Sequence, residues 1–262
     1  MYRYAQERQD ATDLASGRVL HGLPGQPALP VRLADEVFQR CLAARPAGAR
    51  VDGLVLYDPC CGAGYHLTVL GLLHAARLAR VIGSDVDERA LSVAGQNLSL
   101  LDPAGLQDRA NTLARWATHY GKESHRGAVE SAERLHERLL HALGGRVLAT
   151  EYFVADALHG STALERLGPS SVDLVVTDVP YGLRSFWQSE APHRHDDDPG
   201  WNLLETLSAV VAPGGVVGIV SDKGRKTRHE RFRRVELFNI GKRRISIFVL
   251  EAAHQGIGGK GG

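Results

Sequence analysis

The sequence has 262 residues, 44% of them hydrophobic and 23% charged, which is typical of a globular protein with one large domain. No apolar run approaches the roughly 20 residues needed to span a bilayer. The N-terminus lacks the apolar core and cleavage site of a secretion signal. Three cysteines, two of them adjacent, do not form a disulfide framework. We therefore expect a cytoplasmic protein.

The net charge of +1 conceals an uneven distribution of charge. The segment 222–244 contains ten Lys or Arg residues and three acidic residues, so it carries +7 and the rest of the chain carries −6. A basic block on a slightly acidic body suggests a polyanionic partner. A solvated, arginine-rich surface is the alternative, and the sequence leaves both open.

Helical and strand patterns alternate along most of the chain. Helices are expected at 30–43, 65–79, 87–101 and 201–211, and strands at 53–58, 80–85, 151–156, 172–178, 216–221, 233–240 and 245–251. Such alternation implies a mostly parallel sheet covered on both faces. The last two strands read as a hairpin. We predict an α/β fold: a Rossmann-like, seven-stranded, mostly parallel sheet with one antiparallel edge strand and helices on both faces.

A long segment, 102–147, interrupts this alternation. Apolar residues keep helical spacing in both of its halves, which predicts a two-helix insertion. The insertion either covers an edge of the sheet or docks a substrate, and the sequence does not decide between these roles.

The stretch LVLYDPCCGAGYHLTVLG, residues 54–71, contains either a cysteine site or a ligand-binding loop. Adjacent Cys60 and Cys61 cannot easily direct both thiols at one zinc ion, and there is no C-x-x-C spacing, so we predict no metal. A loop fits better. Gly62 and Gly64 lack a Cβ and let a ligand approach the main chain, and the helix that follows offers free N–H groups.

Acidic residues at strand ends indicate the kind of ligand. Asp85 lies about twenty residues after the glycines and is placed to bind two ribose hydroxyls. The loop lacks the third glycine of a dinucleotide fingerprint. It begins with Asp58, which repels a pyrophosphate but suits the α-amino group of S-adenosylmethionine. Asp156 is placed to accept a hydrogen bond from adenine. Asp87 either touches the ribose or caps its helix, and we favour the cap.

The motifs DPCCGAG, GSDVD, AGQNL, VADA and TDVPYG together resemble those of the class I S-adenosylmethionine-dependent methyltransferases. Over nearly the whole chain, GRVLHGLPGQPALPVRLADEVFQRCLA followed by DPCCGAGYHLTVLGLLH is similar to the avilamycin-resistance rRNA methyltransferases of the AviRa type. The resemblance implies methylation of a guanine base in large-subunit (23S) rRNA and reduced binding of an orthosomycin antibiotic. We predict a helical lead-in at 1–52, a class I methyltransferase domain at 53–252 that includes the insertion, and a disordered tail at 253–262. The predicted cofactor-binding residues are Asp58, Cys60, Gly62, Gly64, Tyr65, Asp85, Asp87, Asp156 and Asp178.

The DVPYG stretch ends the fourth predicted strand, beside the expected methyl donor. A base nitrogen is a poor nucleophile, so acceptors that hold its N–H in line with the methyl group favour transfer. Asp178 and main-chain carbonyls near Pro180 fit this task. Tyr181 fits stacking on the base, a contact worth about 1–3 kcal/mol. A strand-ending turn with a core tyrosine is the alternative. The predicted catalytic residues are thus Asp178, Pro180 and Tyr181, and both N1 and N2 of guanine stay open.

The loop after this motif and the basic block suit RNA. Aromatic residues beside basic ones fit an unstacked nucleotide, and the basic block fits phosphates. The predicted RNA-binding residues are Arg184, Trp187, Lys223, Arg225, Lys226, Arg228, Arg243 and Arg244. The His and Asp residues of 193–198 follow no metal-site spacing, and we expect a solvated loop there.

Two other functions compete with RNA methylation. The first is methylation of a small molecule or a protein, against which the basic block argues. The second is a non-catalytic RNA-binding module on a degenerate fold, against which the intact glycine loop argues. We expect a monomer that acts on 23S rRNA, either free or in an assembling or mature subunit, with no membrane partner.

Overall fold

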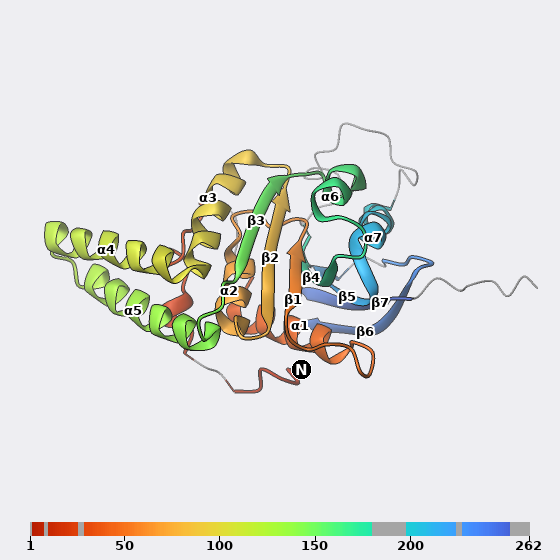
Figure 1. Ribbon diagram of the computed structural model, residues 1–262, viewed down its shortest axis with the longest axis horizontal. Coiled ribbons are helices and arrows are strands. Elements are labelled where there is room, and N and C mark those ends of the chain that lie inside the picture. The colour runs from red at the N-terminus through yellow and green to blue at the C-terminus, as the bar shows by residue number, and fades with distance from the viewer. Residues whose placement is uncertain (1, 8–9, 26–28, 180–197, 224–226, 252–262) are drawn as a thin grey trace, which may run out of the picture.

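The computed structural model describes residues 2–7, 10–25, 29–179, 198–223 and 227–251, and a seven-stranded sheet forms its centre (Figure 1). The strands are β1 (Leu54–Asp58), β2 (Leu78–Asp85), β3 (Ala149–Val154), β4 (Val172–Asp178), β5 (Val211–Asp222), β6 (Phe232–Ile240) and β7 (Arg243–Leu250). The α-helices are α1 (Val31–Ala43), α2 (Tyr65–His74), α3 (Glu88–Leu98), α4 (Pro103–Tyr120), α5 (Glu123–Leu143), α6 (Gly160–Leu167) and α7 (Pro199–Val210). Two 3-10 helices, η1 (Thr12–Leu14) and η2 (Ser99–Leu101), complete the described elements.

The strand order is β3-β2-β1-β4-β5-β7-β6. Strand β1 pairs in parallel with both β2 and β4, and β7 runs antiparallel between β5 and β6. The predicted α/β class, the seven strands and the antiparallel strand in the edge hairpin are therefore confirmed. The order reverses between β1 and β4, and the carboxyl ends of strands at such a switch point are where ligands bind in open α/β sheets.

Two hydrophobic cores fill the two faces of the sheet. Alternate residues of β1 serve different faces, because successive strand side chains point to opposite sides. Leu54 and Leu56 belong to the core beneath α1, α2 and α3, whereas Val55 and Tyr57 belong to the core that contains the buried face of α7. No helix in the described ranges combines the length and apolar character needed to cross a bilayer.

The helix predicted over 65–79 is wrong at its C-terminal end. Helix α2 stops at His74, and β2 begins at Leu78, which pairs with Leu54 of β1. The end of the apolar run that suggested a longer helix, from Leu78 on, forms the first part of β2 instead. Helix α6 was not predicted, because its eight residues bury only Ala163 and Leu167 and give a weak periodic signal.

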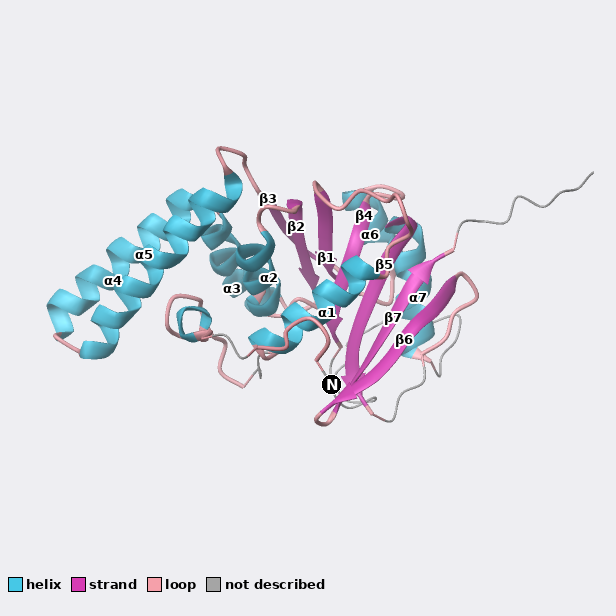
Figure 2. Ribbon diagram, turned by 90° about the horizontal axis from the view of Figure 1, so that it is seen from below, coloured by secondary structure: helices cyan, strands magenta, loops and turns pink. Residues whose placement is uncertain are grey.

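The insertion folds as the predicted pair of helices. Helix α4 begins at the cap Asp102, which accepts a hydrogen bond from the N–H of Ala104 at 2.9 Å, and ends at Gly121 with φ of 63°. Helix α5 returns beside it, and the pair projects away from the sheet (Figures 1 and 2). Contacts with η1, η2 and α2 hold its base.

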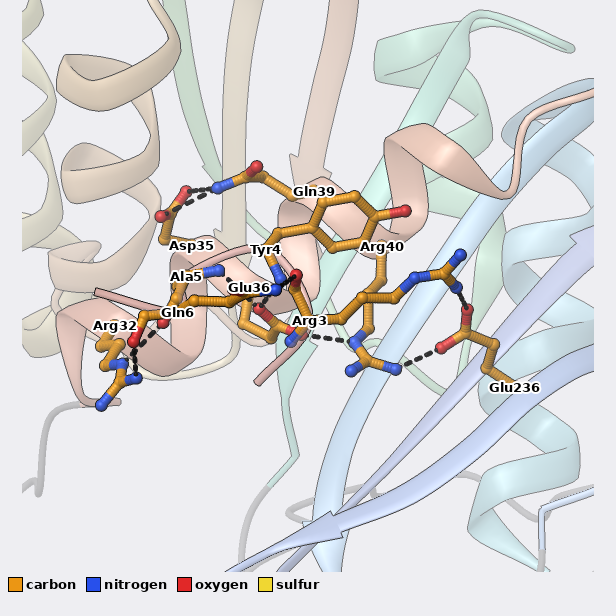
Figure 3. A network of polar contacts seen from close by, with 10 residues as sticks. All are labelled: Arg3, Tyr4, Ala5, Gln6, Arg32, Asp35, Glu36, Gln39, Arg40 and Glu236. Carbon is orange, nitrogen blue, oxygen red and sulfur yellow. Dashed lines mark hydrogen bonds and ion pairs between the residues drawn. The ribbon is translucent and has the colours of Figure 1, made fainter. Parts of the chain in front are cut away.

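A buried carboxylate fastens the first residues of the chain to the fold (Figure 3). Glu36 of α1 is fully buried and accepts hydrogen bonds from the N–H groups of Arg3, Tyr4 and Ala5 at 2.6–2.8 Å. Arg40, one turn later, donates to Glu36 and also to Glu236 of β6, both at 2.6 Å. One network thus joins the N-terminal segment, α1 and the edge of the sheet.

Replacing this carboxylate should loosen the N-terminal segment. In Glu36→Gln an amide NH₂ faces main-chain donors, and a buried group left unpaired costs about 1–3 kcal/mol. We expect a lower melting temperature and faster proteolysis near Arg3. The matched control is Glu130→Gln on α5, whose carboxylate is 67% exposed and whose loss should change stability by less than about 0.5 kcal/mol. Equal losses in the two variants would contradict the role of Glu36.

Candidate functional site

The carboxyl ends of four neighbouring strands bring the predicted acids to one edge of the sheet. Asp58, Asp85 and Asp178 are the last residues of β1, β2 and β4, and Asp156 follows β3 by two residues. The Ala155 N–H donates to the Asp85 carbonyl at 3.1 Å and ties the end of β3 to that of β2. This edge includes the switch point between β1 and β4.

The loop from Asp58 to Gly64 is folded around main-chain hydrogen bonds. The Gly62 N–H donates to Asp85 Oδ2 at 2.7 Å, and the Cys61 N–H donates to the Ser84 carbonyl at 2.9 Å. Gly62 and Gly64 have φ of 51° and 68°, in the left-handed region that favours glycine. A Cβ on Gly64 would also lie 3.1 Å from the Cα of Ala94 on α3. The glycine therefore serves helix packing as well as the turn.

Asp85 accepts hydrogen bonds from two separate turns of the main chain, one at Gly62 and one at Asp87. Its Oδ1 accepts the N–H of Asp87 at 3.0 Å while Oδ2 accepts that of Gly62. Burial raises the pKa of Asp85 above its ordinary value, although these two main-chain donors oppose the rise. Asp87 accepts from the N–H groups of Arg89 and Ala90, so its predicted role as the cap of α3 is confirmed.

Asp58 is fully buried and pairs with a histidine that the sequence did not single out. Its Oδ1 accepts the Cys60 N–H at 3.0 Å, and its Oδ2 lies 2.8 Å from His66 Nε2 without the alignment of a hydrogen bond. Burial works against a charge on His66, but the carboxylates of Asp58 and Asp178 outweigh it and raise the pKa of His66. The sequence held one indication of this pair: His66 lies two residues after Gly64, the last glycine of the loop.

The two thiols of the loop are poor metal ligands. Burial, followed by the nearby carboxylates of Asp58 and Asp85, raises the pKa of Cys60 and of Cys61 well above 9. Both therefore stay protonated near neutral pH, whereas a metal binds the thiolate. In the described part of the chain, no group of three or more His, Cys, Asp or Glu residues is arranged to hold an ion.

Asp156 and Asp178 each have a basic neighbour. Asp156 accepts the Leu158 N–H at 2.8 Å and lies 2.9 Å from His159 Nδ1. Asp178 Oδ2 lies 3.9 Å from Arg243 Nη2, and the arginine side chain is only 18% exposed. The structure thus brings Arg243, predicted to hold phosphate, to the side of the predicted catalytic carboxylate.

The other predicted contacts divide into two groups. Lys223 and Arg228 are exposed, and Arg244 is half-buried. Six predicted residues lie outside the described residues: Pro180, Tyr181, Arg184, Trp187, Arg225 and Lys226. Their roles stay predictions, as does the disordered tail at 253–262.

The N-terminal lead-in is bonded to the elements that carry the glycine loop, which sequence reasoning missed. The Tyr65 hydroxyl donates to the Leu14 carbonyl at 2.7 Å. Asn97 of α3 is fully buried; its Nδ2 donates to the carbonyls of His21 and Ala63 at 2.9 and 2.8 Å, and its Oδ1 accepts the His21 N–H at 2.7 Å. The AGQNL motif contained Asn97, but nothing local in the sequence identified its partners.

A doubly wound sheet whose first strand enters a glycine loop, with acids ending its neighbouring strands, defines a Rossmann-like α/β protein, a class that binds ligands at the switch point of the sheet. Residues 1–243 match the family of the rRNA methyltransferase AviRa. The chain belongs to this family.

Individual members show how close the similarity is. A Streptomyces viridochromogenes protein named 23S rRNA (guanine(2535)-N(1))-methyltransferase is 44% identical over 242 residues, which cover 92% of this chain and 93% of that protein. Crystal structures at 1.5 and 2.4 Å of the rRNA methyltransferase AviRa from the same organism each superpose with a TM-score of 0.82 at 41% identity, covering 95% of this chain and 96% of theirs.

Removal of the buried histidine should destabilise the fold in a pH-dependent way. The pKa of His66 is raised on folding, so its stabilisation is complete below the ordinary pKa of 6.5 and is lost as pH rises through the raised value. Breaking a buried pair costs about 3–5 kcal/mol. We expect His66→Gln to lower the melting temperature most near about pH 6 and less near about pH 9. His141→Gln, an exposed change on α5, should show no such trend; a pH-independent deficit in His66→Gln would refute the ion pair.

Loss of the Asn97 amide should free the glycine loop. Asn97→Ala leaves the Ala63 carbonyl and the His21 N–H without this partner, at a cost of about 1–3 kcal/mol for each unpaired buried group. We expect faster amide exchange in residues 60–66 and 14–21 together. The exposed neighbour change Gln96→Ala is the control. Faster exchange in only one of the two segments would show that Asn97 does not couple them.

Proposed function

We propose that this protein transfers a methyl group from S-adenosylmethionine to a guanine nitrogen of 23S rRNA, with N1 as the acceptor. The observation that carries the proposal is the 44% identity, over 92% of the chain, to a protein named as a 23S rRNA guanine-N1 methyltransferase. The site supports the same chemistry, since it combines a glycine loop with a carboxylate at the end of β4. We also propose the domain boundaries 1–52 and 53–252, a monomeric state and a cytoplasmic location.

The residues at the sheet edge fit S-adenosylmethionine. The loop 58–64 contains no Lys or Arg for a phosphate, and its two glycines keep the main chain accessible. Asp85 would hold the ribose hydroxyls and Asp156 the adenine amino group. When bound, the cofactor supplies a methyl group made electrophilic by its sulfonium. The predicted contact of Asp58 with the cofactor ammonium stays a prediction, because the carboxylate meets Cys60 and His66 in this structure.

Asp178 is the residue proposed to act on the guanine. Methylation at N1 forms an N–C bond, breaks the bond between sulfur and the methyl carbon, and releases the N1 proton. Asp178 would accept the N1–H and take that proton. The Arg243 guanidinium, 3.9 Å away, would orient the carboxylate. The Val179 N–H donates to the Val220 carbonyl at 3.0 Å and fixes the main chain directly after Asp178.

We propose that the modification confers resistance to an orthosomycin antibiotic of the avilamycin type. The family match supports this proposal. Expression of the chain in a sensitive bacterium should raise the inhibitory concentration of avilamycin, and the Asp178→Asn variant should not.

The decisive assay is transfer of radiolabelled methyl to purified 23S rRNA, with 16S rRNA and a metabolite pool as controls. We expect label in 23S rRNA and a fall in kcat of at least about 100-fold in Asp178→Asn, since general acid–base groups contribute about 10²–10⁴-fold. Cofactor affinity should change little. Asp222→Asn, an exposed carboxylate at the end of β5, is the matched control and should keep its activity.

Other outcomes favour the competing functions. Cofactor binding without label in any RNA would favour a small-molecule or protein substrate. RNA binding without cofactor binding would favour a non-catalytic module.

A further inference from the structure

Basic and aromatic side chains lead from the glycine loop to the tip of the α4–α5 hairpin. They begin with His21, which Asn97 holds against the loop. Arg109 of α4 comes next: its Nε donates to the Val19 carbonyl at 2.9 Å, two residues from His21. Burial, together with the charge of Arg109, lowers the pKa of His21. The guanidinium of Arg109 lies 5.3 Å from the ring centre of Trp116, two turns further along α4.

The tip of the hairpin carries a cluster of aromatic rings, in which Trp116, His119 and Tyr120 are exposed and His125 is half-buried. Trp116 and Tyr120 are 42% and 58% exposed. His125, at the start of α5, lies 6.2 Å from the ring of Trp116 and 5.7 Å from that of Tyr120. His119 meets Tyr120 edge-on at 4.6 Å. Large aromatic residues normally bury most of their surface, so this cluster is not explained by packing of the hairpin.

The hairpin packs through buried leucines that continue the core beneath α1, α2 and α3, and its tip is basic. Leucines at 106, 113, 135, 139 and 143 are buried and account for the packing of α4 and α5. The tip segment 109–126 contains four Lys or Arg residues and one acidic residue. Exposed rings among positive charges are the features with which proteins bind unpaired nucleotides: the rings stack on bases and the cations hold phosphates.

The lead-in also binds the hairpin near its tip, in the first turns of α5. Arg18 donates from Nε to Ser131 Oγ at 2.7 Å and from Nη2 to the Gly127 carbonyl at 2.6 Å. A Cβ on Gly127 would lie 2.8 Å from that Nη2, so the glycine makes room for the arginine. Because the same lead-in is bound to the glycine loop through Asn97, the hairpin is held in a defined position relative to the site.

We infer that this surface, formed by His21, Arg109, Trp116, His119, Tyr120 and His125 and called here the arm surface, binds a segment of 23S rRNA distinct from the target guanine. The inference rests on the proposed function and extends it to substrate selection. Trp116, Tyr120 and His125 lie on the α4–α5 hairpin and not at the strand ends that carry Asp58 and Asp178, so RNA bound to them is RNA other than the target guanine. The arm surface thus favours long, folded RNA over a short target stem-loop.

The test compares two substrates: full-length 23S rRNA, and a stem-loop of about 25 nucleotides around the guanine that the wild type labels. The double variant Trp116→Ala/Tyr120→Ala should raise KM for 23S rRNA about tenfold, because stacking on two bases is lost, and leave kcat unchanged. Its KM for the stem-loop should not change. Trp116→Phe/Tyr120→Phe keeps the rings and should retain the wild-type KM. Leu140→Ala, a 48% exposed truncation on α5, is the control.

A second measurement tests the charges. In filter binding to 23S rRNA, Lys122→Ala and Arg126→Ala should each reduce the slope of log affinity against log salt by about 1. Arg138→Ala removes an exposed charge from the same helix and should leave the slope unchanged.

Several results would overturn the inference. An unchanged KM for 23S rRNA in the alanine double variant would do so, and so would an equal rise with the stem-loop, which would place these rings in the catalytic site. Weaker activity on ribosomal subunits alone, with naked 23S rRNA unaffected, would mean that the arm meets a ribosomal protein. If the wild type labels no RNA, the proposed function fails, and filter binding of the same variants still decides whether the arm binds RNA.

Discussion

The side-chain amide of Asn97 is the contact on which the site depends. It is fully buried and uses both ends of the amide to join α3, the Ala63 carbonyl in the glycine loop and the main chain of His21. Buried amides are almost always fully hydrogen-bonded, so three segments far apart in the sequence share one arrangement. The bonds from Tyr65 to Leu14 and from Arg109 to Val19 extend the same arrangement outward. The lead-in is therefore fastened to the glycine loop and to the helices beside it.

At several points in this structure a carboxylate side chain holds main-chain N–H groups in place. Asp85 accepts hydrogen bonds from two main-chain N–H groups and Glu36 from three. Asp58 accepts one and also forms an ion pair with His66. An acid that holds N–H groups in place shapes the loop around it before any ligand arrives, and such pre-ordering reduces the conformational cost of binding. This explains how one acid can be both a structural brace and a ligand contact. Asp85, proposed to hold the ribose, is only partly buried and so stays accessible while it holds its two N–H groups.

The sequence allowed the sheet and the acids at its strand ends to be predicted, because both follow from local patterns. Strand β4 was predicted with its observed bounds, and the acids at the strand ends lie where the alternation of strands and helices indicated. The bonds of Asn97 to Ala63 and His21 span 34 and 76 residues, and such long-range contacts leave no local pattern. The same reason explains the overlong second helix: the pairing of Leu78 with Leu54 is a tertiary contact that helix periodicity cannot show.

The shape of the molecule bears on the choice between a small substrate and a long one. The hairpin of β6 and β7, which carries much of the basic block, forms one end of the sheet, and the α4–α5 hairpin projects beyond the opposite end (Figures 1 and 2). The strand ends with Asp58 and Asp178 lie between them. A small molecule would need neither extension, since the loops at the switch point suffice to enclose it. A basic strand hairpin and a helical hairpin with a basic tip, on either side of the carboxylate proposed as catalytic, instead suit a polyanion that crosses the site and continues on both sides. Contacts with its phosphates would fix register, and Asp178 would select the base.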